Sequence, residues 1–415
     1  LGAAMLLFGG ALQGMLLPVR AQLEAFDAIS IGLIGSSYFS GFILGCFQGP
    51  RLVRGVGHIR TFTAIVAVAS CTILLHAAIV GPVAWWIFRA ITGFCLAILY
   101  LVIESWLNEK ATNANRGMIF STYVILGHAM ATAGSFGVSL MNPSDFRIFI
   151  VGSIMISLAA VPIALSRREA PAPIKVTRLR PGKILATSPV AFFGCLGAGL
   201  ANGSFSALMP VYAAEMGFKV SDIAILGAFS AMAAAISQWP LGRLSDRLDR
   251  RYLIITASIG SAIAGAALAI VQIGAVAPII IGIVAFSAMS LPIYAMAVAH
   301  ANDHAEPDEF VAISGGLLLV WAGGAVCGPI LASGAMSWSG PGALFLFTAA
   351  MHVGLAAFSA WRISRRAAPS EEERSSFDEA VTMAQTVALV ETAPSDEDSE
   401  TDDEDVSREE VQELL

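Results

Sequence analysis

The chain has 415 residues, of which 56% are hydrophobic and 13% charged, and its mean hydropathy is +0.73. A soluble globular domain has about 45–50% apolar and about 25% charged residues, so these values exclude an ordinary soluble domain and indicate a chain that lies mostly in lipid. The formal charge of −7 combines two regions: residues 371–415 hold 17 acidic and 2 basic residues, whereas residues 1–370 hold 14 acidic and 22 basic ones. The body is mildly basic and the tail strongly acidic.

Twelve apolar stretches are long enough to cross a bilayer, whose core of about 30 Å needs about 20 residues of helix. Gly, Pro or short polar clusters bound many of them, and Ser30 and Asp222 are expected to cap the second and eighth helices. Because Leu1 already lies in an apolar stretch and no Met precedes it, we expect a short N-terminal arm upstream. The stretches lie near residues 1–22, 30–49, 60–80, 83–104, 117–141, 146–165, 189–213, 222–241, 252–271, 277–300, 310–333 and 342–362.

The distribution of basic residues predicts the orientation of these helices. If the first helix starts in the cytoplasm, 20 of the 24 Lys and Arg residues fall in cytoplasmic loops, the linker or the tail. Cytoplasmic loops of membrane proteins carry such an excess of positive charge. We therefore expect both termini in the cytoplasm.

The two halves of the chain repeat each other. The segment from Leu17 aligns with the segment from Met209 at a spacing of 192, which pairs Pro18 with Pro210. Such internal repeats are typical of secondary transporters. The predicted units are an N-terminal six-helix half (1–165), a basic linker (166–188), a C-terminal six-helix half (189–362) and an acidic tail (363–415), which its composition predicts to be disordered.

The segment "GRLSDRLDRR", Gly242 to Arg251, lies in the predicted loop between the eighth and ninth helices. It resembles the major facilitator signature G-x-L-x-D-R-x-G-R-R, with Asp249 in place of the usual Gly. The glycine permits a close helix approach, the aspartate can face a helix N-terminus, and the arginines can pair with carboxylates on the facing half. In the first half Val53 stands at the position of the aspartate. The resemblance implies a gating role for Arg54, Gly242, Asp246, Arg247, Arg250 and Arg251.

Further motifs carry the same resemblance. "RAITGFCLA", Arg89 to Ala97, resembles the R-x-x-x-G pattern of the family's fourth helix, and "SSYFSG", "VIESWLNE", "NRGMIFSTY" and "SQWPLGRLSDR" resemble the YcaD-like bacterial subfamily. The resemblance implies an all-α membrane fold of twelve helices as two six-helix pseudo-repeats. It also implies a central path lined by helices 1, 4, 7 and 10.

Arg89 lies about two turns inside the membrane, where an unpaired charge costs at least ~2.5–3.5 kcal/mol. We interpret it as binding an anionic substrate group or tuning a proton site; the alternative is a side chain that pairs with a carbonyl or snorkels to the interface. Glu104 lies about 22 Å farther along the same helix, at the cytoplasmic mouth. It is either a proton carrier or, as we favour, a gate partner of Arg54 or Arg247.

Other polar residues in the apolar stretches are candidates for binding or coupling. Arg20 could meet anionic cargo or anchor the helix at the interface, and His128 could titrate near neutral pH or simply pack. His300 and His304 have a metal-like spacing, but a solvated helix end is the favoured reading. By the fold that the resemblance implies, polar residues face the central path at Gln13, Asn202, Ser206, Tyr212, Ser290 and Tyr294.

The sequence holds no nucleotide-binding loop, metal constellation or nucleophile–base pair, and its five cysteines lack metal or redox spacing, so we expect neither an enzyme nor a cofactor. We predict a monomeric secondary active transporter of the bacterial inner membrane, working by alternating access and coupled to protons. Uptake of a metabolite or vitamin such as riboflavin is favoured. The alternatives are efflux of amphipathic compounds and a transport-dead sensor, whose acidic tail would bind a cytoplasmic partner. No nucleic acid is expected among the partners.

Overall fold

The computed structural model describes residues 1–111, 115–165, 177–178, 181–306, 309–365, 377 and 390–391. Within these residues twelve helical spans are long and apolar enough to cross a membrane. This confirms the predicted all-α membrane fold. The first six spans are α1 Gly2–Leu23, α2 Ala28–Val56, α3 His58–Ala78, α4 Pro82–Lys110, α5 Arg116–Ser139, and α6 Phe146–Leu158 with α7 Ala160–Ala164.

The second set of six begins after the short helix α8, Pro181–Thr187. The tenth span is two consecutive helices because Pro292, which lacks an N–H group, interrupts the helical hydrogen bonds. These spans are α9 Pro189–Glu215, α10 Val220–Arg247, α11 Arg250–Ile270, α12 Val276–Ser290 with α13 Ile293–Asn302, α14 Phe310–Ser339 and α15 Ala343–Ile363.

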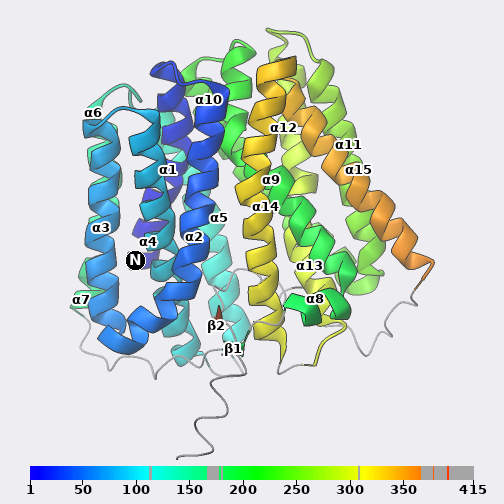
Figure 1. Cartoon of the computed structure of the whole chain (residues 1–415), viewed down its shortest axis with the longest axis horizontal. Helices are drawn as coiled ribbons and strands as arrows, with labels where there is room; N and C mark the ends of the chain where they lie inside the picture. Colours follow the sequence, from blue (N-terminus) through cyan, green and yellow to red (C-terminus); the bar gives the residue numbers. More distant parts are fainter. Residues whose placement is uncertain are drawn as a thin grey trace, which may run out of the picture.

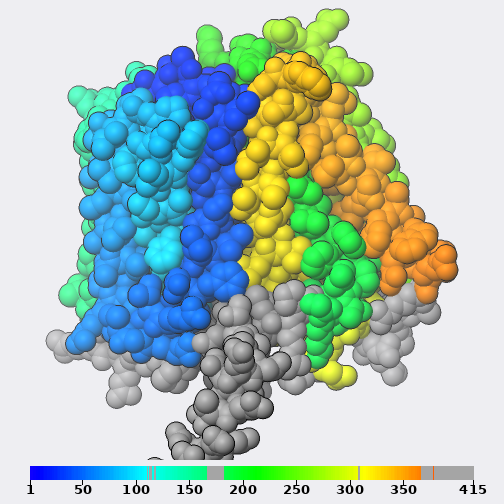
Figure 2. Space-filling view, in the orientation of Figure 1, coloured from blue at the N-terminus to red at the C-terminus, as the bar shows by residue number. Residues whose placement is uncertain are grey.

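The two sets of spans form two bundles side by side, with most of the first set on the left and most of the second on the right of Figure 1, and with α5 and α10 in the middle. The bundles meet along two seams, where α2 packs on α14 and α5 packs on α10. Figure 2 shows the first seam at the surface, between blue α2 and yellow α14. Many large apolar side chains on the outside are exposed, including Ile263, Ile281 and Trp338. A surface of this kind suits lipid rather than water.

The N-caps of α2 and α10 each lie three residues before the expected cap residue. Asp27, not Ser30, caps α2, and its carboxylate accepts a hydrogen bond from the Ser30 backbone N–H at 3.3 Å. Lys219 holds the cap position of α10, and Asp222 lies in the first turn of that helix. An acidic residue in the first turn interacts favourably with the helix dipole, which explains why the sequence signal falls there.

The signature segment is also more helical than its loop assignment predicted. α10 continues to Arg247 and α11 begins at Arg250, so only Leu248 and Asp249 form the turn. Asp249 caps α11 by accepting from the Arg251 backbone N–H at 3.0 Å. The end of the molecule that holds this turn also holds a two-stranded parallel pair, β1 Thr177–Arg178 with β2 Val390–Glu391. We call it the linker end; it lies at the bottom of Figure 1.

Candidate functional site

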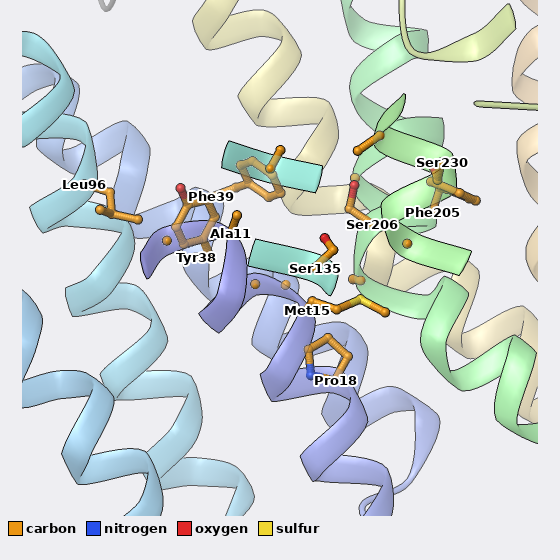
Figure 3. A pocket seen from close by; sticks show the side chains of 18 of the residues that line it. Ala11, Met15, Pro18, Tyr38, Phe39, Leu96, Ser135, Phe205, Ser206 and Ser230 are labelled. Carbon is orange, nitrogen blue, oxygen red and sulfur yellow. The ribbon is translucent and has the colours of Figure 1, made fainter. Parts of the chain in front are cut away.

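A cavity of about 420 Å³ lies between the two bundles. Its walls come from α1, α2, α4 and α5 on one side and from α9 and α10 on the other, with Leu291 after α12. In Figure 3, Tyr38 and Leu96 lie across from Phe205 and Ser230. The predicted path runs along spans 1, 4, 7 and 10, which are α1, α4, α9 and α12 with α13. The cavity wall also includes α2, α5 and α10, which are spans 2, 5 and 8.

Arg89 is the charged side chain among the described residues that line this cavity, and it is 9% exposed. Its position follows from a close helix crossing. A methyl group at Gly93 would collide with the Tyr38 carbonyl oxygen, so the absence of a side chain lets α4 lie against α2. One turn away, the Arg89 guanidinium lies 4.3 Å from the centre of the Tyr38 ring. This is a cation–π arrangement, which partly offsets the cost of burying the charge.

Gln13 of α1 supports Arg89 from a second helix. Its Oε1 accepts a hydrogen bond from Arg89 Nη1 at 3.3 Å, and the Gln13 side chain is fully buried. Its amide Nε2 has no hydrogen-bond partner among the described residues. Gln13 is not among the described residues that line the cavity, so it holds the Arg89 guanidinium from behind the wall. The polar centre of the wall is therefore the positive charge of Arg89.

The rest of the cavity wall is apolar or carries hydroxyl groups. Tyr38 and Tyr100 flank Arg89, and Tyr100 interacts electrostatically with Arg89 and also with Glu104 farther along α4. Ser135 of α5 adds a hydroxyl group in the first half, and Ser206 and Ser230 add hydroxyl groups from the second half (Figure 3). All charge on the described wall therefore belongs to the first half, and the second half offers Phe205 and hydroxyls.

The family model of the Major Facilitator Superfamily matches residues 1–309. The chain belongs to the Major Facilitator Superfamily. It is 28% identical to an uncharacterized MFS-type transporter of Enterobacter sp. (strain 638), over 84% of this chain and 91% of the relative. It is 26% identical to the uncharacterized MFS-type transporter YcaD of Escherichia fergusonii, with the same coverage.

Solved structures of the superfamily share the fold. A mutant of the nucleoside transporter NupG superimposes with a TM-score of 0.74 at 14% identity, covering 87% of this chain and 98% of that one. A bacterial homologue of the human lysosomal transporter Spinster, inward-facing and occupied, gives 0.71 at 16% identity, covering 90% and 97%. At these identities the likeness concerns the fold alone.

Two predicted site residues of this superfamily member, Asn202 and Ser290, meet in a network behind the cavity wall. The Ser290 hydroxyl donates to Asn202 Oδ1 at 2.6 Å and lies 2.8 Å from His352 Nε2. Because the hydroxyl has only one hydrogen, His352 Nε2 must be the donor in the second contact, which leaves Nδ1 unprotonated in the neutral ring. Nδ1 has no partner among the described residues.

Sequence reasoning missed His352. The residue is fully buried on α15, a span that does not line the described cavity, and it reaches α9 and α12 through Ser290. The signal that could have found it is the one used for His128, a single histidine inside an apolar span. No sequence pattern predicts that α9, α12 and α15, which are far apart along the chain, meet at this network.

Other candidates lie away from the described lining of the cavity. Arg20 pairs with Glu24 at 2.5 Å and donates to the Pro143 carbonyl at 3.0 Å, so it ties the end of α1 to the loop before α6. The Tyr212 hydroxyl donates to the Leu268 carbonyl at 2.9 Å. These contacts bind helices of one half to each other.

Two further candidates connect elements around the seams. His128 of α5 lies 2.8 Å from Gln238 Oε1 of α10, a contact between the two halves. The Tyr294 ring packs on Trp321 of α14 with ring centres 5.7 Å apart. Glu104 is buried, at 2% exposure, on the part of α4 that leads to the linker end.

Three of the predicted gating residues, Asp246, Arg250 and Arg251, lie in a charged cluster at the linker end. Arg250 is almost fully buried and pairs with Asp303 at 3.3 Å and with Asp246 at 3.7 Å. Arg251 pairs with Asp249 at 2.6 Å. Both arginines thus find carboxylates within their own half, in addition to any partner across the seam that the sequence predicted.

Asp249, which replaces the usual glycine of the signature, is part of this cluster. Partial burial alone would raise the pKa of its carboxyl, but the hydrogen bonds from Arg251 outweigh burial and lower that pKa below its usual value. The carboxylate is therefore held in its charged form. In the first half, Val53 is buried at the position of the signature aspartate and contributes an apolar contact instead.

The end of α13 differs from its prediction as a solvated helix terminus. His300 and Asp303 are both buried, and the His300 ring packs edge-on against His304 with centres 4.7 Å apart. Asp303 is buried because it neutralises Arg250 across the helix interface, a tertiary partner that the local sequence does not reveal.

Proposed function

We propose that this protein is a secondary active transporter of a small organic solute with an anionic or acceptor-rich head group. The buried Arg89, which Gln13 and Tyr38 hold in place, carries the proposal. A buried ionisable group within a membrane span is a functional candidate by default, and here it lines a cavity shared by both halves. The head group would pair with the Arg89 guanidinium, which Gln13 holds from behind the described wall of the cavity.

The cavity wall also supports a class for the rest of the solute. The volume of about 420 Å³ falls within the range of about 300–1,000 Å³ that is common for small-molecule sites. Phe39 and Phe205 present aromatic surface on opposite sides. A flat, partly apolar body with polar edges would suit these walls, and a metabolite or vitamin such as riboflavin has this character.

Alternating access is the mechanism that two packed bundles around a central cavity support. The charge pattern of the sequence supports a cytoplasmic linker end and cytoplasmic termini, in a bacterial inner membrane. We further propose coupling to protons. Support comes from titratable groups inside the spans: His128 at the α5–α10 seam, and His352 with its unpaired Nδ1.

The proposal is tested first by ligand binding. Purified protein is screened by thermal unfolding against a set of organic anions, nucleosides and vitamins that includes riboflavin. A ligand at 100 times its Kd stabilises the folded state by about 2.7 kcal/mol. We expect at least one hit whose effect is lost in Arg89→Ala and retained in Arg60→Ala, a matched change at an exposed arginine. Hits that survive in Arg89→Ala would place the binding site elsewhere.

The second test is transport of that hit into proteoliposomes, with and without an imposed pH gradient. Accumulation that depends on the gradient supports proton coupling, and equilibration without dependence contradicts it. The largely apolar cavity wall also favours a second candidate, efflux of amphipathic compounds. Everted vesicles distinguish the two, because an exporter accumulates its substrate inside them when protons are pumped in.

A further inference from the structure

The outer face of α15 carries an apolar stripe that leads to two arginines. Leu346, Val353 and Trp361 follow one another at helical spacing and are 54%, 58% and 51% exposed. α15 lies at the outer edge of the second half, on the right of Figures 1 and 2. In a membrane this stripe faces the lipid chains. It runs toward the linker end, where Arg362 and Arg365 follow Trp361.

Three aromatic rings from two helices lie at the end of this stripe. Phe193 of α9 packs on Phe358 of α15 with ring centres 4.8 Å apart, and Phe358 packs on Trp361 at 5.8 Å. We call Phe193, Phe358 and Trp361 the aromatic ridge. Phe193 is 41% exposed, so both ends of the ridge are open to the surroundings. Tryptophan is enriched where membrane spans meet the lipid head groups, which suits Trp361 at the end of its span.

Two guanidinium groups lie over the last ring of the ridge. The Cζ atoms of Arg362 and Arg365 are each 5.8 Å from the centre of the Trp361 ring. An aromatic face attracts a cation within about 6 Å. Arg362 belongs to the last turn of α15, and Arg365 follows two residues after the helix ends. The ring therefore gathers two positive charges where the span ends.

These two charges are not neutralised within the described part of the chain. At the start of α11, by contrast, Arg251 pairs with the Asp249 carboxylate. Neither Arg362 nor Arg365 has a carboxylate within ion-pair distance among the described residues. The C-terminus of α15 offers only about half an elementary negative charge, which is less than two guanidinium groups carry. The arrangement therefore favours an external anion.

We propose that this surface binds an anionic phospholipid of the leaflet at the linker end. The phosphate lies on Arg362 and Arg365, and an acyl chain follows the apolar stripe of α15. Planar guanidinium groups direct their N–H donors at phosphate oxygens, which makes arginine well suited to this head group. A free phosphate would satisfy the arginines alone, whereas a lipid also covers the aromatic ridge and the stripe.

The expected orientation of the chain supports the same ligand. The distribution of basic residues in the sequence favours a cytoplasmic linker end. The cytoplasmic leaflet is the one whose anionic lipids attract basic residues beside membrane spans. The site at the end of α15 thus combines charge complementarity with an apolar surface of the right orientation.

The first experiment measures lipid affinity by native mass spectrometry. The full chain in detergent is titrated with phosphatidylglycerol and with phosphatidylcholine of the same acyl chains. We expect tighter binding of phosphatidylglycerol. Each basic residue near an anionic surface contributes about fivefold, so the double variant Arg362→Gln with Arg365→Gln should weaken that binding by about twentyfold. Its affinity for phosphatidylcholine should stay as in the native chain.

The matched control is a second double variant, Arg51→Gln with Arg60→Gln. It removes two exposed arginines of α2 and α3 at the same end of the molecule, so the net charge changes equally. We expect it to keep the native affinity for phosphatidylglycerol. Equal weakening in the two double variants would reduce the effect to net charge and overturn the site. Equal affinity of the native chain for the two lipids would overturn it as well.

The second experiment locates the bound lipid by fluorescence quenching in vesicles. The chain has seven tryptophans, so the difference between the native protein and Trp361→Phe isolates the signal of Trp361. We expect brominated phosphatidylglycerol to quench this signal more strongly than brominated phosphatidylcholine. Equal quenching by the two lipids would place the bound lipid elsewhere and contradict the proposal.

A competition arm distinguishes a lipid from a free phosphate. Glycerol 3-phosphate carries the phosphate without acyl chains, and we expect it to leave phosphatidylglycerol bound at equal concentration. Displacement of the lipid would mean that the site holds a free phosphate. Size-exclusion chromatography checks the folding of each variant. The measurements use neither solute nor pH gradient, so failure of the proposed transport function would leave them unaffected.

Discussion

Gly35 of α2 lies so close to Ala207 of α9 that a methyl group on the glycine would be 2.6 Å from the alanine Cβ. The repeat spacing of 192 residues carries Gly35 onto Gly227 and Met15 onto Ala207. The structure contains that equivalent contact as well, because a methyl group on Gly227 would be 3.0 Å from Met15 Cε. Each half thus presents the same glycine to the same position of the other half, and both contacts border the cavity.

The two glycines should respond differently to alanine. Replacing Gly by Ala inside a helix gains about 1 kcal/mol, whereas overpacking a tight contact costs about 1–3 kcal/mol. Ala207 Cβ is fixed to its backbone, so we expect Gly35→Ala to lower thermal stability. The end of the Met15 side chain can move, so Gly227→Ala should be nearly neutral. Gly354→Ala is the control, because nothing lies within 4 Å of a methyl group there. Equal destabilisation by both changes at the cavity would contradict this reasoning.

Gln13→Leu should weaken binding of the solute found by the screen. The change removes the acceptor of Arg89 and the unpaired amide while keeping a similar volume. A lost hydrogen bond to a charged group is worth about 1.5–3 kcal/mol, so we expect at least a tenfold rise in Kd by calorimetry. Arg89→Ala should abolish binding while membrane insertion stays normal. An unaltered Kd in Gln13→Leu would mean that Gln13 does not position Arg89 for binding.

Ser290→Ala should destabilise the second half more than a serine change elsewhere in its core. Without the hydroxyl, Asn202 Oδ1 and His352 Nε2 each lose a buried partner, at about 1–3 kcal/mol for each unsatisfied group. Ser261→Ala is the matched control, since that buried hydroxyl only bonds back to the Ala257 carbonyl of its own helix. Thermal unfolding in detergent measures both. Similar losses would mean that the network contributes little.

Asp249→Asn should expose a pH-dependent contribution at the signature turn. The pKa of Asp249 is lowered in the folded state. Its stabilising effect is therefore complete above the ordinary carboxyl pKa of about 3.9, and it is lost as the pH falls through the lower folded-state pKa. The stability difference between the native protein and Asp249→Asn should be constant from about pH 7 to 5 and should shrink below about pH 4. A difference that changes between pH 5 and 7 would point to another titrating group.

Much of the fold was predictable from the chain itself, because the bilayer imposes a simple rule. A span needs about 20 apolar residues whose backbone groups bond within the helix, so the twelve spans match the predicted stretches in number and place. The repeat followed from a sequence self-alignment, and the importance of Arg89 from the cost of a charge in lipid. These are local properties, which composition and spacing record.

Tertiary structure decided how the polar residues are used. Gln13 meets Arg89, Asn202 meets His352 through Ser290, and Arg250 meets Asp303, and each pair joins residues that are far apart along the chain. Spacing within one helix indicates which residues share a face, but helix packing decides which face meets which. The same holds for Phe377, whose ring lies against Gly242. The sequence by itself determined that the chain is a two-part bundle of twelve helices, and only the packing of those helices decided which polar groups are paired and which remain open to a ligand.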